Sequence, residues 1–157
     1  MHAREWITVA TALQIIGRLI TVFKSVSESS CNNVLTSIDW YIVPVLNPDG
    51  YEYSHQTDRF WRKNRRPAPE GSTSDGVDLN TNFEVGYGLG ADTNPYSEVY
   101  KGTHTRSFRT RNTIVQLGTQ LNTTLLYYVS LHTYGQSWLR SRGEHGGAGD
   151  GGQECFP

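Results

Sequence analysis

The sequence has 157 residues, which is enough for one domain with a hydrophobic core. Its 14 basic and 15 acidic side chains give a formal net charge of −1, so composition offers no electrostatic basis for binding nucleic acid or an anionic membrane. We see no apolar run of the length that crosses a bilayer, and residues 1–7 do not contain the apolar stretch of a signal peptide. We therefore expect no nucleic-acid partner, no membrane partner and no signal peptide in this chain.

The first predicted element is a helix over residues 5–24. Its large apolar side chains recur at alternating intervals of three and four residues, which places them on one helical face. They are Trp6, Val9, Leu13, Ile16, Ile20 and Phe23. We expect this face to pack on the core, with Trp6 against a sheet, and the helix to end where the polar stretch 25–33 begins.

Two apolar segments predict buried β-strands. Residues 39–47 are rich in aromatic and β-branched side chains, and residues 125–132 form a continuous apolar run. Pro44 counts against a fully paired position for the first strand, because proline has no N–H to donate. Together with a second helix predicted near residues 106–121, these elements indicate an α/β fold with a partial mixed β-sheet flanked by helices.

The region between the first strand and the second helix is polar and rich in glycine and proline. Asn47-Pro48-Asp49-Gly50 predicts a turn, and residues 51–105 then predict a long loop of the kind that usually carries function. The composition changes again near the end of the chain, where six of the thirteen residues 140–152 are glycine. This end of the chain has the composition of a flexible tail.

The cysteines and the one glycosylation sequon leave alternatives open. Cys31 and Cys155 either pair or remain free thiols, since two cysteines fix no disulfide framework. Asn122-Thr123-Thr124 is a sequon that gives weak support to a secreted context.

Three residues form a candidate metal site. His2 and Glu5 are three residues apart where the first helix begins, so both side chains lie on one helical face. A catalytic zinc needs a third protein ligand, and His132 ends an apolar strand, where α/β sheets place ligand sites. Spacing alone leaves the alternative of a surface His–Glu pair and a hydrogen-bonded histidine at a strand end.

Six segments in a fixed order supply the missing specificity. They read His-Ala-Arg-Glu-Trp-Ile at 2–7, Val-Pro-Val-Leu-Asn-Pro-Asp-Gly-Tyr at 43–51, Phe-Trp-Arg-Lys-Asn-Arg at 60–65, Gly-Val-Asp-Leu-Asn-Thr-Asn-Phe at 76–83, Tyr-Ser-Glu-Val-Tyr-Lys-Gly at 96–102 and Ser-Leu-His-Thr-Tyr-Gly-Gln at 130–136. From His2 to about Trp138 the chain resembles the zinc metallocarboxypeptidases of the carboxypeptidase A/B family. This resemblance implies a fragment of the metallocarboxypeptidase fold, with residues 1–139 as a partial peptidase catalytic domain and residues 140–157 as an unmatched glycine-rich tail.

The resemblance also implies roles for individual residues. It makes His2, Glu5 and His132 the ligands of one Zn²⁺ ion. It makes Arg62 the electrophilic arginine that stabilises an oxyanion, although a solvated charge in a basic run is the alternative that Arg62 offers by itself. It makes three further residues part of the substrate-binding surface: Arg4, Asn80 and Tyr134.

Two departures from the family pattern stand out. The position after Asn80 is normally arginine and is Thr81 here, which removes a bidentate grip on a C-terminal carboxylate. Arg65 and Arg66 are the nearest arginines in sequence that could replace it. A disulfide of many family members is also missing, because Ser74 and Tyr96 stand at its two positions.

We expect the family's activity to be hydrolysis of C-terminal residues from peptides and proteins by a secreted, extracellular, monomeric enzyme. The family's general-base glutamate has no match in these residues, so we expect this chain to be incomplete at both ends. The alternative is a catalytically inactive zinc- or peptide-binding remnant. An unrelated α/β domain with a chance His-x-x-Glu is a third interpretation, which the ordered segments disfavour. Whether aromatic or basic C-terminal residues are preferred is not determined by these residues.

Overall fold

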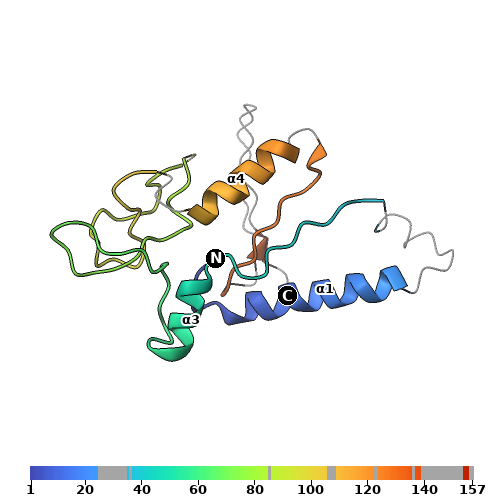
Figure 1. The fold of residues 1–157 in the computed structure, drawn as a ribbon, viewed down its shortest axis with the longest axis horizontal. Helices are drawn as coiled ribbons and strands as arrows, with labels where there is room; N and C mark the ends of the chain where they lie inside the picture. The colour runs from blue at the N-terminus through green and yellow to red at the C-terminus, as the bar shows by residue number, and fades with distance from the viewer. Residues whose placement is uncertain are drawn as a thin grey trace.

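The computed structural model describes residues 1–24, 35, 37–84, 86–105, 109–121, 124–135, 137–138 and 154–155. The elements are α1 (Trp6–Lys24), α3 (Pro48–Gln56), α4 (Arg109–Leu121), β1 (Ser137–Trp138) and β2 (Glu154–Cys155). In Figure 1 the N-terminus lies beside α3, α1 runs away from it, and the region between α3 and α4 forms a separate group of loops. The cysteine pairing, the sequon and most of the predicted 140–157 tail lie outside the described residues.

Helix α1 begins one residue after the predicted start and ends at Lys24, so its prediction is confirmed. The predicted packing face is wrong. The side chains buried in α1 are Thr8 and Ala12, whereas Leu13 is 56% exposed and Ile20 is also exposed. The reason is that α1 carries apolar side chains on more than one face, so the apolar period alone does not select the buried one.

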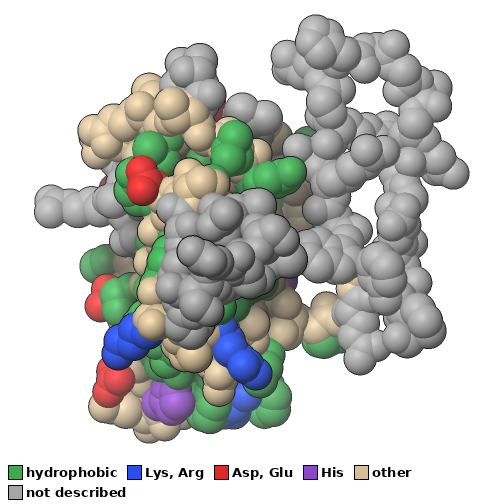
Figure 2. Space-filling view, turned by 90° about the vertical axis from the view of Figure 1, so that its right-hand side faces the viewer, with side chains coloured by type: hydrophobic (Ala, Val, Ile, Leu, Met, Phe, Trp, Pro, Cys, Tyr) green, Lys and Arg blue, Asp and Glu red, His purple; other side chains and the backbone are tan. Residues whose placement is uncertain are grey.

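The apolar character of α1 also corrects the expectation about membrane-spanning runs. By length and composition alone α1 passes as a membrane span, with 19 residues, a mean hydropathy of 1.6 and 11% of that window buried. Mostly buried core helices of soluble proteins and signal sequences near the N-terminus pass the same test. Viewed from the Lys24 side of the molecule, hydrophobic side chains reach the surface among charged ones (Figure 2).

Helix α3 replaces the predicted turn and the start of the predicted loop. Asn47 is its N-cap and accepts a hydrogen bond from the Gly50 N–H, Pro48 occupies the first turn, and Asp49 adds a negative charge there. These are three standard features of a helix start, because proline at this position loses no helical hydrogen bond and an acidic side chain favours the N-terminal end of the dipole. The same four residues therefore begin a helix instead of a turn.

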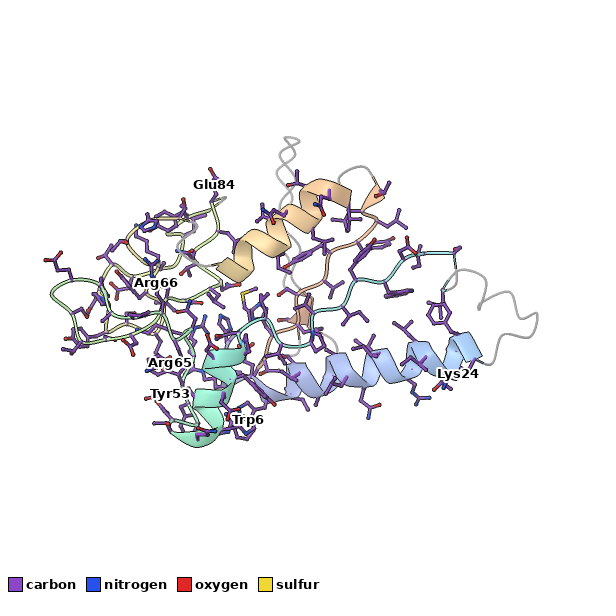
Figure 3. All side chains as sticks on the ribbon, viewed as in Figure 1. Trp6, Lys24, Tyr53, Arg65, Arg66 and Glu84 are labelled. Atoms are coloured by element: carbon purple, nitrogen blue, oxygen red, sulfur yellow. The ribbon has the colours of Figure 1, made fainter. Side chains whose placement is uncertain are left out.

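Trp6 packs on α3, which corrects the expectation that it packs on a sheet. Its indole N–H donates to Ser54 Oγ at 2.9 Å, and its ring stacks on His55 with centroids 3.8 Å apart. The Arg59 guanidinium covers the ring at 3.7 Å from its centroid. Figure 3 shows Trp6 beside α3. These contacts fix the start of α1 against α3.

The two predicted strands form no ladder among the described residues, so the predicted sheet is not confirmed, and the expectation that their side chains are buried is wrong. Side chains in both segments are exposed, including Tyr41 and Tyr127, the latter at 86%. Described β-structure consists of the two-residue antiparallel pair β1–β2 and an isolated bridge between Asp92 and Tyr100. A strand buries its side chains only when a neighbouring strand pairs with its backbone, and neither segment has such a neighbour in the described part of the chain.

The predicted second helix and long loop are largely confirmed. Helix α4 covers residues 109–121 of the predicted 106–121, and residues 106–108 are not described. Residues 57–84 and 86–105 form turns and irregular structure. The most deeply buried side chains of the described residues lie in this loop region or beside it, and they are mainly polar: Asn82, Asp78 and Ser54. The core that positions the site is thus held by hydrogen bonds more than by apolar packing.

Candidate metal centre

Three segments that are distant in sequence meet at the start of α1. The Ala3 N–H donates to the Arg62 carbonyl at 3.1 Å, and the Ala3 carbonyl accepts from Ser54 Oγ at 3.2 Å. The Asn64 N–H donates to the Val77 carbonyl at 3.1 Å, and Asn64 Oδ1 accepts from the Val77 N–H at 2.8 Å. These bonds tie the start of α1 to α3 and to residues 62–64, and residues 62–64 to residues 76–78.

His2, Glu5 and His132 lie together at this junction. His2 Nδ1 is 2.7 Å from Glu5 Oε1 and 3.2 Å from His132 Nδ1, and His132 Nδ1 is 3.3 Å from Glu5 Oε2. One ligand atom from each residue falls within 4.8 Å of the others. His2 and Glu5 are buried, and the His132 side chain is about one third exposed. The structure therefore brings together the three residues that the sequence predicts as ligands.

Asp78 is a fourth member of the site that the sequence analysis did not identify. Its Oδ1 lies 3.2 Å from His2 Nε2. Each ring nitrogen of His2 therefore faces a different carboxylate, Nδ1 that of Glu5 and Nε2 that of Asp78. A carboxylate on the far nitrogen of a metal-binding histidine fixes the ring orientation and leaves the other nitrogen free for the ion. The signal that could have found Asp78 is its place in Gly-Val-Asp-Leu-Asn, two residues before the predicted substrate residue Asn80.

The charges of this junction are tightly coupled. Burial alone would raise the pKa of Glu5, but the imidazoles of His132 and His2 outweigh burial and lower that pKa to about 2. Burial also opposes ionisation of Asp78, yet His2 and Arg62 together hold the pKa of Asp78 below its ordinary value. Burial would lower the pKa of His2, but the carboxylates of Asp78 and Glu5 outweigh it and raise that pKa. Two buried carboxylates are thus ionised and attract positive charge to this point.

The donor set fits a zinc ion. Nitrogen and carboxylate ligands at the ~2.0–2.2 Å typical of tetrahedral zinc are separated by roughly 3.4 Å, close to the 3.2 and 3.3 Å found between His132 Nδ1 and its two neighbours. Glu5 Oε2 is buried and accepts no hydrogen bond among the described residues. A buried carboxylate oxygen that lacks a donor, beside two histidine nitrogens that face each other, is the arrangement that a divalent cation satisfies.

The predicted catalytic arginine lies next to these ligands. Arg62 Nε and Nη2 donate to Asp78 Oδ2 at 3.2 and 3.0 Å. Arg4, a predicted substrate residue, instead forms a bidentate ion pair with Glu98 at 2.8 and 2.9 Å and donates to the Phe60 carbonyl. The Arg4 side chain therefore has intramolecular partners for the donors that a substrate would use.

The remaining predicted substrate residues are more exposed. Asn80 is exposed, and its backbone N–H donates to Asp78 Oδ1 at 3.0 Å. Thr81 Oγ1 donates to the Asp78 carbonyl at 3.3 Å. Tyr134 is fully exposed, at 103%. The structure thus places Asn80 and Thr81 beside the metal cluster through Asp78, whereas it gives Tyr134 no buried environment.

Arg65, a candidate replacement for the missing arginine, is held by other residues, and hydrogen bonds connect the two positions of the missing disulfide. Arg65 pairs with Asp75 at 2.7 Å and lies over the rings of Tyr53 and Trp61. At the disulfide positions, Tyr96 OH is 3.1 Å from Thr73 Oγ1. Next to it, Lys63 Nζ donates to Ser74 Oγ at 3.2 Å and to the Pro95 carbonyl at 2.6 Å. Hydrogen bonds from the buried Lys63 thus connect the two segments that a disulfide would join.

Comparisons with known proteins show which family the chain resembles. Residues 1–147 match the family model of zinc carboxypeptidases. Carboxypeptidase A4 of Mus musculus is 36% identical over 137 residues, covering 87% of this chain and 32% of its own length. An inactive metallocarboxypeptidase of Talaromyces stipitatus is 37% identical, covering 88% of this chain and 24% of its own length. The solved structure of bovine thrombin-activatable fibrinolysis inhibitor, in complex with a tick carboxypeptidase inhibitor, superimposes with a TM-score of 0.76 at 34% identity, over 91% of this chain and 48% of that one.

These matches bear on fold and family in different ways. The solved relatives have the α/β carboxypeptidase fold, while the central sheet is not seen among the described residues here. The chain spans less than half the length of the proteins it matches. The family model covers most of the sequence, and the ordered segments, the His2–Glu5–His132 cluster and the relatives all indicate the same group of hydrolases. The chain belongs to the zinc carboxypeptidase family.

Proposed function

We propose that this chain carries the zinc-binding part of a metallocarboxypeptidase that removes C-terminal residues from peptides and proteins. The observation that carries the proposal is the convergence of His2, Glu5 and His132 on one point, with the Arg62 guanidinium held beside them through Asp78. Family membership supports zinc as the ion and a peptide C-terminus as the substrate. Secretion and a monomeric state are part of the same proposal and follow from family resemblance.

Each residue has a defined task in this proposal. His2, Glu5 and His132 hold one zinc ion, and Asp78 fixes the ring of His2. The bound metal supplies a Lewis acid and lowers the pKa of a coordinated water. Arg62 donates N–H groups to the oxygen on which negative charge develops, a contribution that is typically worth a factor of about 10²–10³ in kcat. Asn80, which lies beside this cluster because its backbone N–H donates to Asp78, is proposed to bind the C-terminal end of the peptide.

A second candidate function is zinc-dependent peptide binding without hydrolysis. Thr81 favours it, because a threonine hydroxyl cannot form the two parallel charge-assisted hydrogen bonds of an arginine to a carboxylate. One relative of similar identity is itself described as inactive. Arg65 does not offer an obvious substitute for the missing arginine, since Asp75 and two aromatic rings already hold its guanidinium.

Zinc titration combined with a peptidase assay separates these functions. We expect the chain to bind one zinc ion per molecule, measured by calorimetry. Zinc-dependent release of C-terminal amino acids from unblocked peptides would then support hydrolysis by this chain, although the family's general-base glutamate has no match in it. The matched control substrate is the same peptide with an amidated C-terminus. Zinc binding without release of amino acids from either peptide would favour the binding function, and absence of zinc binding would contradict both.

Restoring arginine at position 81 is expected to increase the preference for a free C-terminal carboxylate. We expect Thr81→Arg to bind the unblocked peptide at least tenfold more tightly than the wild type does, because a bidentate charge pair contributes up to about 2–5 kcal/mol when partly desolvated. Affinity for the amidated peptide should not change. The measurement is the Kd or KM for both peptides.

Thr81→Lys is the matched control for this substitution. Lysine carries the same charge but donates as a single point, so it should give a smaller gain than arginine. Equal gains for Thr81→Lys and Thr81→Arg would show that position 81 acts only through net charge. No gain for either variant would contradict a carboxylate-binding role for this position.

A further inference from the structure

One buried carboxylate joins the metal cluster to the neighbouring arginine. The Asp78 side chain is 0% exposed, and its two oxygens have different partners. Oδ1 is 3.2 Å from His2 Nε2 and accepts from the Asn80 N–H at 3.0 Å. Oδ2 accepts both Nε–H and Nη2–H of Arg62. The carboxylate is therefore fixed on one side by His2 and backbone, and it holds the guanidinium on the other.

We propose that Asp78 is the positioning residue for Arg62, fixing its guanidinium at a set distance and orientation from the His2–Glu5–His132 cluster. The inference rests on the proposed function for its consequence in catalysis, but the contact itself is a property of this chain with or without hydrolysis. Asp78 acts through Arg62 and touches no substrate. The Asp78 carboxylate would thus have two roles, orienting the His2 ring and positioning the Arg62 guanidinium.

The geometry leaves Arg62 able to act while it is held. A guanidinium has five N–H donors, and Asp78 Oδ2 engages two of them on one edge. Three N–H groups remain for other acceptors, and 18% of the side chain is exposed. An arginine side chain that is free in solution loses roughly 2 kcal/mol of rotamer entropy when it is fixed. Because Asp78 fixes the Arg62 side chain before substrate binds, this entropy loss does not reduce the affinity for a substrate oxygen.

The backbone also favours this pairing. The Arg62 carbonyl accepts from the Ala3 N–H, one residue from His2, and residue 64 pairs with residue 77 beside Asp78. Arg62, His2 and Asp78 thus come from three segments whose main chains are hydrogen-bonded to one another. The carboxylate can hold both partners in one register because the segments that carry them are already tied.

A four-member mutant cycle at saturating zinc tests the inference. Asp78→Asn, Arg62→Met and the double variant are compared with the wild type for binding of a phosphinic dipeptide, a tetrahedral anion that needs no hydrolysis. We expect Asp78→Asn to weaken probe binding at least tenfold in the wild-type background and by less than twofold in the Arg62→Met background. An equal loss in both backgrounds would show a merely structural role and overturn the proposal.

A measurement on the wild-type chain keeps the test independent of whether Asp78→Asn folds. With ¹⁵N-labelled arginine, the Nε–H of Arg62 should exchange with solvent at least tenfold more slowly than that of Arg18, which is exposed on α1. Equal exchange rates would overturn the proposal. Slow exchange and a coupled cycle in a chain that does not hydrolyse peptides would leave Asp78 as the positioning residue while contradicting the proposed catalytic function.

Discussion

Replacing His132 with alanine is expected to abolish the zinc-dependent rise in the thermal midpoint of unfolding. A ligand that binds only the folded state stabilises it by about 4 kcal/mol at a thousandfold excess over Kd, which for a chain of this size raises Tm by on the order of 10 °C. His132 is the one ligand of the three that lies far from α1 in sequence, 130 residues after His2. Without it, zinc retains only the local His2–Glu5 pair of the predicted ligands, and the metal no longer links the start of α1 to residue 132.

The loss of zinc affinity in His132→Ala should exceed the loss caused by substituting residues that only surround the ligands. Substitutions outside the ligand set typically reduce metal affinity by roughly 10–100-fold, so His132→Ala should reduce it further. His104→Ala is the matched control, because His104 is also exposed and its ring is hydrogen-bonded to Thr103, away from the ligand cluster. Calorimetry and thermal unfolding with and without zinc measure both variants. Full retention of zinc affinity by His132→Ala would contradict the assigned ligand set.

The helices were the most predictable part of the fold because their signals are local. The apolar period of residues 6–24 and the polar stretch that follows define α1 without reference to the rest of the chain. The start of α3 was predictable from the same kind of signal, since Asn47 and Pro48 are a capping residue and a first-turn proline. The helix was missed because the same four residues also begin turns. The residues after Gly50 are mostly polar, so they show no clear apolar period that would distinguish a helix from a turn.

The strands were less predictable because a strand depends on partners that the local sequence does not name. Residues 39–47 and 125–132 have the composition of buried strands, but the described residues offer neither segment a ladder. The burial of α1 was missed for a related reason. Which face of a helix is buried depends on the part of the protein that it packs against. The buried residues of α1, Thr8 and Ala12, are small side chains, so neighbouring segments can lie close to the helix backbone there.

The candidate site also combines residues that local spacing predicts with residues that only long-range contacts bring together. His2 and Glu5 follow from helical spacing, whereas His132 required the ordered segments of the family resemblance, since nothing local connects it to His2. Asp78 has no spacing relation to any ligand, and it reaches His2 through long-range contacts, among them the bonds of Ala3 to Arg62 and of residue 64 to residue 77. The commitment of Arg4 to Glu98 likewise depends on a loop contact 94 residues apart in sequence.

A single methyl group at Gly76 should disrupt the contacts between residues 63–64 and residues 76–78. Gly76 has φ = +89°, and a Cβ at this position would fall on the carbonyl oxygen of Asn64 and lie 2.9 Å from Lys63 Cβ. We expect Gly76→Ala to destabilise the chain by roughly 2–5 kcal/mol. About 1–2 kcal/mol of this comes from the left-handed backbone conformation, and the remainder comes from forced displacement of a packed backbone. Thermal or denaturant unfolding measures the loss.

Gly71→Ala separates the two contributions. Gly71 has a similar φ of +78°, but a Cβ there would meet nothing within 4 Å, so only the conformational cost remains. We expect Gly71→Ala to cost about 1–2 kcal/mol and to leave zinc affinity unchanged. Gly76→Ala should also weaken zinc binding, because residues 76–78 carry Asp78 to His2. Equal destabilisation by the two variants, with zinc affinity unaffected in both, would contradict the view that the close approach of residues 63–64 to residue 76 holds the metal centre together.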